Sequence, residues 1–246
     1  MDSYYTIQTR KGLMAEALVV DTLETFDTLK SGWTSADYEQ QTRQDIDLLG
    51  VVKLPSIQSM GVLEVSIKYQ EAGKSYGAGG EFGFELYEVR ASDNQREYKP
   101  FLTADDYKVL TVLQGGKVYV FTVGMVRRYL KSNNGGEHNF TKTRGLTAKL
   151  RQQLADCNYR YSNTISGYID VEDFVASQPV VVLEVEPAKL EVMELLAEVN
   201  LSVDALRDTH YALSLLRFVT TLTKGKTKGT KRAMLSLVEQ ITSLYA

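Results

Sequence analysis

The chain has 246 residues, of which 43% are hydrophobic and 24% are charged. This composition fits one large domain or a domain with an appendage, and it excludes a largely disordered chain. The formal net charge of −3 excludes a globally basic surface, so any contact with nucleic acid requires a local patch of positive charge. The single cysteine, Cys157, excludes an internal disulfide and a zinc site built from cysteines.

The N-terminal segment, MDSYYTIQTRKG, lacks the apolar core of a signal peptide. The chain has no run of the roughly 18 apolar residues that a membrane-spanning helix needs. A lone cysteine also suits a reducing compartment. We therefore expect a cytoplasmic protein that does not enter a membrane.

Apolar residues at helical spacing predict a first helix over residues 11–29. Its apolar stripe consists of Leu13, Val20, Leu23 and Phe26. Glu16 falls within this stripe, three residues after Leu13 and four before Val20. A carboxylate in apolar surroundings costs free energy unless it has a partner or a function. The alternative is that Glu16 lies at the edge of the stripe and reaches water.

The stretch from Asp45 to Gln70 predicts a β-hairpin. Its second strand, VLEVSIKYQ, alternates strictly between apolar and polar residues, which is the period of a strand with one buried face. The polar face carries Glu64, Ser66, Lys68 and Gln70. The first strand, DIDLLGVV, begins with two acids on one face, Asp45 and Asp47. Pro55 and Gly61 mark the turn region, so the hairpin gathers carboxylates and a lysine into one place.

The rest of the chain predicts strands and helices up to residue 186 and helices after Pro187. Strands are predicted over residues 81–90, 117–123 and 180–185, with a short helix and a strand between 103 and 112. Helices are predicted over residues 126–131, 145–154, 188–199, 203–222 and 233–244. We therefore expect an α/β fold in residues 1–186 and a helical C-terminal region in residues 187–246.

The acids and the lysine of this region have the chemistry of a hydrolytic site for phosphodiesters. Glu16, Asp47 and Glu64 supply the oxygen ligands that hard cations such as Mg²⁺ and Mn²⁺ prefer. A bound metal polarises a phosphoryl group and lowers the pKa of a bound water. Lys68 would hold that water or stabilise the negative charge that develops on the phosphate.

The order of these residues resembles the PD-(D/E)XK nuclease superfamily. The segment GLMAEALVV is similar to the opening helix of that family, DIDLLGV to its second motif and VLEVSIKYQ to its third, within a resemblance that covers residues 11–131. It implies a restriction-endonuclease-like fold, a mixed β-sheet flanked by helices, and Mg²⁺-dependent cutting of DNA. It assigns Glu16 to the helix acid and Asp47 to the strand acid, with Asp45 as the competing choice. Lys68 would be the motif lysine, with Gln70 one pleat beyond it.

One position departs from the family pattern. The family has an acid, or sometimes a glutamine, two residues before the lysine, and this chain has Ser66 there. Glu64 lies on the same strand face, about 7 Å further back by the rise of a β-strand. Either Glu64 takes over as a ligand, or the site uses Glu16 and Asp47 with a backbone carbonyl, or the site is inactive. We expect a metal-dependent nuclease; the alternative is an inactive nuclease-fold protein that binds nucleic acid or a protein partner.

Three groups of basic residues are candidates for contacts with nucleic-acid phosphates, which position a nucleic acid without reading its sequence. They are Arg127, Arg128 and Lys131; then Lys142, Arg144, Lys149 and Arg151; and finally the run KGKTKGTKR, with Lys226, Lys228 and Lys231. The alternative for the last group, which is rich in glycine, is a solvated surface loop. The helical C-terminal region is compatible with substrate binding or with a homodimer.

Overall fold

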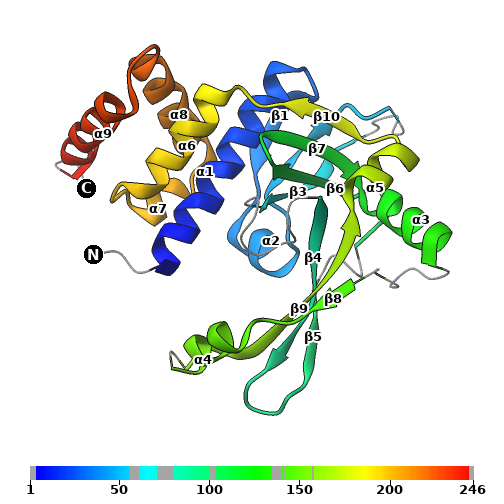
Figure 1. The fold of residues 1–246 in the computed structure, drawn as a ribbon. Coiled ribbons are helices and arrows are strands. Elements are labelled where there is room, and N and C mark those ends of the chain that lie inside the picture. The colour runs from blue at the N-terminus through cyan, green and yellow to red at the C-terminus, as the bar shows by residue number, and fades with distance from the viewer. Residues whose placement is uncertain are drawn as a thin grey trace.

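The computed structural model describes residues 4–55, 61–70, 80–99, 104–134, 140, 142–156 and 158–243 (Figure 1). Residues 56–60 of the predicted hairpin turn, and Cys157, lie outside the described residues. The described chain is α/β, with a mixed six-stranded sheet flanked by helices and a helical C-terminal region. This coarse fold class, predicted from the sequence, is confirmed.

The large sheet has the strand order β1-β2-β3-β6-β7-β10. Its strands are β1 (Leu29–Ser35), β2 (Leu48–Val52), β3 (Leu63–Gln70), β6 (Val109–Gln114), β7 (Lys117–Thr122) and β10 (Val181–Glu184). Strands β3 and β6 are parallel, and the other neighbours are antiparallel. The predicted hairpin is confirmed, because β2 and β3 pair with Leu49 opposite Glu64.

Helix α1 (Tyr4–Thr25) lies across one face of the large sheet (Figure 1). It ends earlier than predicted, because Asp27 adopts a left-handed conformation with a φ of 52°. The N–H of Thr28 then reaches the carbonyl of Leu23 (2.9 Å), and the N–H of Asp27 reaches that of Glu24 (3.1 Å). This pair of hydrogen bonds is the Schellman termination of a helix, and it turns the chain directly into β1.

Of the remaining helices, α2 and α5 are not predicted from the sequence, and the others differ from the predicted ones mainly at their ends. They are α2 (Tyr38–Arg43), α3 (Val123–Asn134), α4 (Ala148–Asp156), α5 (Val171–Ser177), α6 (Pro187–Glu198), α7 (Val203–Leu206), α8 (Thr209–Thr223) and α9 (Lys228–Ser243). The helix predicted over residues 203–222 is interrupted, because the Asp208 carboxylate accepts hydrogen bonds from the N–H groups of His210 (3.0 Å) and Tyr211 (3.2 Å) and caps α8. None of the helices in the described part of the chain combines the length and hydropathy that a bilayer crossing needs.

Two hydrophobic cores lie on the two faces of the large sheet. The first lies between the sheet and α1, α6 and α8, and the second lies between the opposite face and α3, α5 and a second sheet. In β6, Val109 belongs to the first core and Leu110 to the second, as alternation along a strand requires. Side chains on both sides of the predicted boundary at Pro187 share the first core. The division into two domains at that residue stays a prediction.

A second sheet, with the strand order β5-β4-β9-β8, extends away from the body of the molecule (Figure 1). Its strands are β4 (Glu81–Arg90), β5 (Arg96–Tyr98), β8 (Lys142–Arg144) and β9 (Tyr161–Asp170). The base of β4 packs in the second core through Phe82 and Phe84. We call the outer part the arm and define it as residues 87–98, helix α4 and residues 158–165. Only β4 of these strands is predicted from the sequence.

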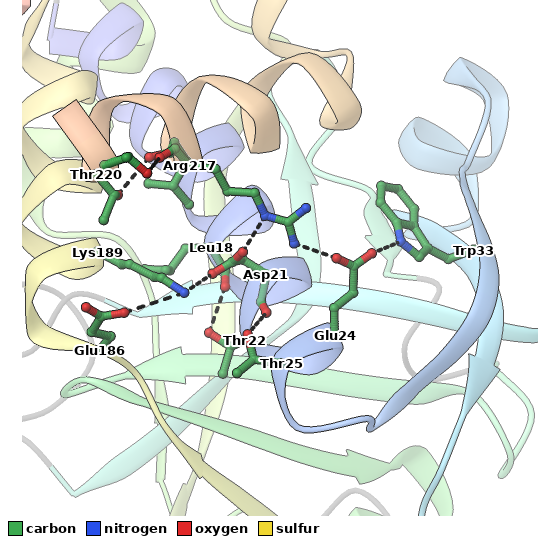
Figure 2. Close-up of polar contacts among 12 residues, drawn as sticks. Leu18, Asp21, Thr22, Glu24, Thr25, Trp33, Glu186, Lys189, Arg217 and Thr220 are labelled. Carbon is green, nitrogen blue, oxygen red and sulfur yellow. Dashed lines mark hydrogen bonds and ion pairs between the residues drawn. The ribbon is translucent and has the colours of Figure 1, made fainter.

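Helices α6 and α8 are joined to α1 through the buried carboxylate of Asp21 (Figure 2). Asp21 accepts hydrogen bonds from Lys189 Nζ on α6 (2.6 Å) and from Arg217 Nε on α8 (2.7 Å). Arg217 also donates to Glu24 (2.6 Å), which accepts a hydrogen bond from the indole N–H of Trp33 (2.6 Å). The C-terminal helices therefore hold the helix that carries Glu16.

Candidate active site

Asp47 is fixed by the backbone of the hairpin just before β2. Its N–H donates to the carbonyl of Val65 and its carbonyl accepts from the N–H of Ala36, both at 2.9 Å. Its carboxylate accepts a hydrogen bond from the N–H of Ile67 (2.5 Å). The sheet therefore holds the carboxylate of Asp47 against β3.

Asp45 lies in the turn between α2 and β2 and has a left-handed φ of 55°. Its carboxylate forms an ion pair with the ammonium of Lys68 and accepts a hydrogen bond from the hydroxyl of Ser66 (3.1 Å). Ser66 is completely buried, and it stands where the resembled family has an acid. The carboxylate of Asp45 therefore lies next to Ser66, at the position where the resembled family has an acid.

Glu16 approaches this group from α1. Burial, and next the charge of Asp47, raise the pKa of Glu16 to about 8, although Lys68 and Arg207 oppose the shift. Burial also raises the pKa of Asp47, against the opposing effects of Lys68 and the N–H of Ile67. With a pKa of about 8, Glu16 keeps its proton near neutral pH. A divalent cation bound between Glu16 and Asp47 would displace that proton.

Lys68 and Asp45 remain charged instead. Burial alone would lower the pKa of Lys68, but the charges of Asp45 and Asp47 raise it above its usual value. Burial alone would raise the pKa of Asp45, but the ammonium of Lys68 holds it below its usual value. Lys68 is therefore suited to act as a fixed positive charge and unsuited to act as a base.

The structure brings Glu16, Asp47 and Lys68 of the predicted site together and adds Asp45 to them. Among the described residues, Glu64 forms no hydrogen bond or ion pair with them. Its side chain is exposed and lines an open pocket of about 460 Å³ together with Gln44 and Lys108. The pattern of alternation placed Glu64 on the same strand face as Lys68, but it could not show which neighbours each side chain meets.

Gln70 makes a structural contact. Its side-chain nitrogen donates to the carbonyl of Gly83 (2.6 Å), and its side-chain oxygen accepts from the N–H of the same glycine (3.2 Å). The side chain is buried and links β3 to β4. Both polar atoms of Gln70 are thus engaged within the protein, so the geometry favours a structural role over the predicted catalytic one.

The predicted metal ligands are Glu16, Asp47 and Glu64. Within the described ranges, no three acidic, histidine or cysteine side chains are grouped so that they could hold a metal ion. Mg²⁺, however, usually keeps several waters and is bound by one or two carboxylates together with substrate phosphates. Glu16 and Asp47 fit this smaller requirement, because their carboxyls are partly buried and interact electrostatically with one another and with Lys68.

Two cations lie near the site although no sequence motif predicts them there. Lys108 is buried, and its ammonium donates to the backbone carbonyl of Gln44 (2.6 Å), the residue before Asp45. Arg207, which follows α7, lowers the pKa of Glu16. Neither residue belongs to a motif, because the chain brings both to the site through contacts between elements far apart in sequence.

The predicted phosphate-binding residues do not form one surface. The side chains of Arg128, Lys131, Lys226 and Lys228 are exposed. Arg127 pairs with Asp106 (2.5 Å) at the start of α3. Figure 1 places α3 and α9 on opposite sides of the molecule, so the first and last basic groups cannot contact the same short stretch of nucleic acid.

Lys231 differs from the other predicted phosphate-binding residues. It is buried, and its ammonium pairs with Glu191 of α6 (2.6 Å). Helix α9 begins at Lys228, ahead of the predicted start at residue 233, so Lys231 lies on the helix and faces α6. Its charge is neutralised inside the protein, which makes it unsuitable for a phosphate.

Comparison of the chain with family models, with curated proteins and with solved structures finds no match. The chemistry of the site must therefore be judged from its geometry. A fixed cation, Lys68, lies beside two carboxyls with raised pKa values, Glu16 and Asp47, and beside one with a lowered pKa, Asp45. This arrangement suits a divalent cation and a phosphate bound next to each other.

The raised pKa of Glu16 predicts that the protein loses stability as the pH rises. The folded state holds more protons than the unfolded state between pH 4.5, the ordinary value, and about 8, so the free energy of unfolding falls by up to about 1.4 kcal/mol per pH unit in that window. Glu16→Gln should remove much of this slope and be more stable than the parent at pH 8.5 to 9, as measured by urea unfolding.

Glu39→Gln is the matched control, because Glu39 is exposed on α2, and this variant should keep the slope of the parent. Mg²⁺ added to the parent should also flatten the slope, since the cation replaces the proton. Equal slopes for the parent and Glu16→Gln would show that Glu16 titrates as an ordinary surface acid.

Proposed function

We propose that this chain is a metal-dependent nuclease of the restriction-endonuclease-like type that hydrolyses phosphodiester bonds, with DNA as the expected substrate. The observation that carries the proposal is the convergence of Glu16 from α1, Asp47 at the start of β2 and Lys68 on β3. These residues occur in the order and on the elements that the PD-(D/E)XK resemblance implies. The mixed sheet flanked by helices is compatible with that fold.

Each residue has a distinct role in the proposed reaction. Mg²⁺ or Mn²⁺, when bound, would polarise the phosphoryl group and lower the pKa of a water ligand. Glu16 and Asp47 would hold the cation, which would replace the proton of Glu16. The ammonium of Lys68 would stabilise the negative charge that builds on the phosphate. Asp45 would act as a positioning residue, because it pairs with Lys68 and accepts the hydrogen bond of Ser66.

The direct test is cutting of single- and double-stranded DNA by the parent and by Asp47→Asn, in Mg²⁺, in Mn²⁺ and in EDTA. We expect cutting that requires either metal and that is lost in Asp47→Asn, because the variant removes one of the two charges that would hold the cation. Calorimetric titration with Mn²⁺ should show binding to the parent and weaker binding to the variant. Cutting by Asp47→Asn at the rate of the parent would show that the site lies elsewhere.

A second candidate function is binding of nucleic acid or a protein partner without catalysis. The observation that favours it is Ser66, whose buried hydroxyl occupies the position of an acid in the resembled family. The carboxylate that accepts the hydrogen bond of Ser66, that of Asp45, is engaged with Lys68. An inactive protein of this kind would bind DNA equally well with and without metal and would show no Mn²⁺ binding at Glu16 and Asp47.

A further inference from the structure

The arm is held together mainly by polar contacts. Among its described residues only Leu154 of α4 is buried. Its centre is the carboxylate of Glu97, which accepts hydrogen bonds from Arg90 Nε (2.9 Å), from Arg160 (2.8 Å) and from the hydroxyl of Tyr161 (2.5 Å). A segment without a core of its own adds little to the stability of the fold. Most of its side chains are therefore available for contacts with another molecule.

The arm carries positive charge in a chain whose net charge is negative. The arm contains five basic residues and four acids, a balance of +1 against −3 for the whole chain, and its positive surplus lies in α4 and residues 158–165, which contain three basic residues and one acid. Lys149 and Arg151 lie on α4 with exposed side chains, and no carboxylate among the described residues pairs with either of them. The acid of this segment, Asp156, accepts a hydrogen bond from Gln152 (2.8 Å). Helix α4 thus carries two exposed cations, Lys149 and Arg151, that no described carboxylate neutralises.

Exposed aromatic rings accompany these cations. Tyr98 is 60% exposed and Tyr159 is 50% exposed. Each lies next to a second tyrosine, with ring centroids 5.6 Å apart for Tyr87 and Tyr98 and 6.0 Å apart for Tyr159 and Tyr161. The guanidinium of Arg96 lies 4.8 Å above the ring of Tyr87. Cations interleaved with exposed ring faces suit a nucleic-acid strand, whose phosphates meet the charges and whose unpaired bases stack on the rings.

The arm is continuous with the candidate active site. At its base, the backbone of Gly83 on β4 forms two hydrogen bonds with the side chain of Gln70, which lies two residues after Lys68 on β3. At its side, Tyr98 shares a pocket of about 460 Å³ with Gln44 and Lys108, which lie next to Asp45. From Gly83 to Arg90 the strand spans roughly 23 Å at about 3.3 Å per residue. That is the length of about seven stacked nucleotides at about 3.4 Å each.

We propose that the arm binds a nucleic-acid strand with unpaired bases and leads it to Lys68. Lys149 and Arg151 would contact its phosphates, and Tyr98 and Tyr159 would stack on its bases. The inference rests on the proposed function for the identity of the ligand. Binding by the arm requires no metal, however, so it can be measured in EDTA, where no metal-dependent cutting occurs. A parent protein that binds through the arm but never cuts would leave this inference standing and remove the nuclease proposal.

The test measures binding by fluorescence anisotropy of a labelled oligonucleotide of mixed sequence, either single-stranded or annealed to its complement. The oligonucleotide is titrated with the full chain in EDTA at several salt concentrations. Lys149→Ala/Arg151→Ala should weaken binding of both forms by roughly tenfold and reduce the salt slope on the single strand by about 1.4. Tyr98→Ala/Tyr159→Ala should weaken binding of the single strand by roughly tenfold or more and leave binding of the duplex nearly unchanged.

The comparison variant is Lys226→Ala/Lys228→Ala, which removes two exposed cations of the competing basic run near α9, far from the arm; if the arm is the binding surface, this variant should bind like the parent. Circular dichroism melting shows whether each variant is folded. If folded Lys149→Ala/Arg151→Ala binds like the parent, or if the α9 variant loses as much affinity as the α4 variant, the arm is not the binding surface. If the tyrosine variant loses single-strand and duplex binding equally, the inference of stacked bases is wrong.

Discussion

Asp21→Asn is expected to lower the free energy of unfolding by about 3 kcal/mol, because hydrogen bonds to a charged group contribute about 1.5 to 3 kcal/mol each. The carboxylate of Asp21 is only 4% exposed and accepts charged hydrogen bonds from both Lys189 and Arg217. An asparagine keeps the shape but lacks the charge and one of the two acceptor oxygens. The loss should appear in urea unfolding at neutral pH as a lower midpoint with an unchanged slope.

The size of this effect should depend on pH in a defined direction. Burial alone would raise the pKa of Asp21, but the hydrogen bonds from Lys189 and Arg217 lower it below its ordinary value of 3.8. A lowered pKa in the folded state stabilises the protein above the ordinary value, and this stabilisation is lost as the pH falls through the folded-state pKa. The difference between the parent and Asp21→Asn should therefore shrink below pH 4.

Glu24→Gln is the control for this prediction. Glu24 also binds Arg217, but its side chain is 32% exposed, and a glutamine can still accept the hydrogen bond of Trp33. Its cost should stay below about 1 kcal/mol, as for other partly exposed ion pairs. Equal stability of the parent and Asp21→Asn would mean that apolar packing alone holds α6 and α8 on α1.

The elements that the sequence predicts well are those with one buried face. Strand β3 alternates because α1 covers one of its sides, and the apolar stripe of α1 exists because the helix packs on the sheet. Strand β9 is missed because its outer half, YSNTI, belongs to the arm, which has almost no core to impose a pattern. Strand β1, LKSGWTS, is missed for a similar reason, since it is an edge strand with polar residues and a glycine.

The candidate site is predicted only where local sequence determines it. Asp47 and Lys68 are predicted because a hairpin places both on neighbouring strands. The pairing of Asp45 with Lys68 depends on the left-handed turn at Asp45, and the engagement of Gln70 depends on a second sheet at Gly83. Periodicity gives the face of a strand on which a side chain lies, but it does not give the residue that the side chain meets.

Lys68→Met is expected to reduce the rate of metal-dependent cutting by about 10² to 10³, the usual cost of removing one group that stabilises developing charge. The ammonium is fixed beside Asp47 by its ion pair with Asp45, so it needs little rearrangement to meet a phosphate. Lys68→Arg should not restore the rate, because a planar guanidinium cannot replace a compact ammonium in this position. The measurement is the single-turnover rate of cutting at saturating metal.

The metal affinity separates the role of Lys68 from that of Asp47. Lys68→Met should bind Mn²⁺ at least as tightly as the parent, because it removes a positive charge near Glu16 and Asp47, whereas Asp47→Asn should bind it more weakly. Asp45→Asn should lower the rate and weaken Mn²⁺ binding less than Asp47→Asn does, because it removes a nearby negative charge but no proposed ligand. The double variant Asp45→Asn/Lys68→Met removes both partners of the ion pair, so neither partner is left without its counter-charge. It therefore controls for misfolding of the single variants, and it should cut no faster than Lys68→Met. Cutting by folded Lys68→Met at the rate of the parent would exclude the lysine from the reaction.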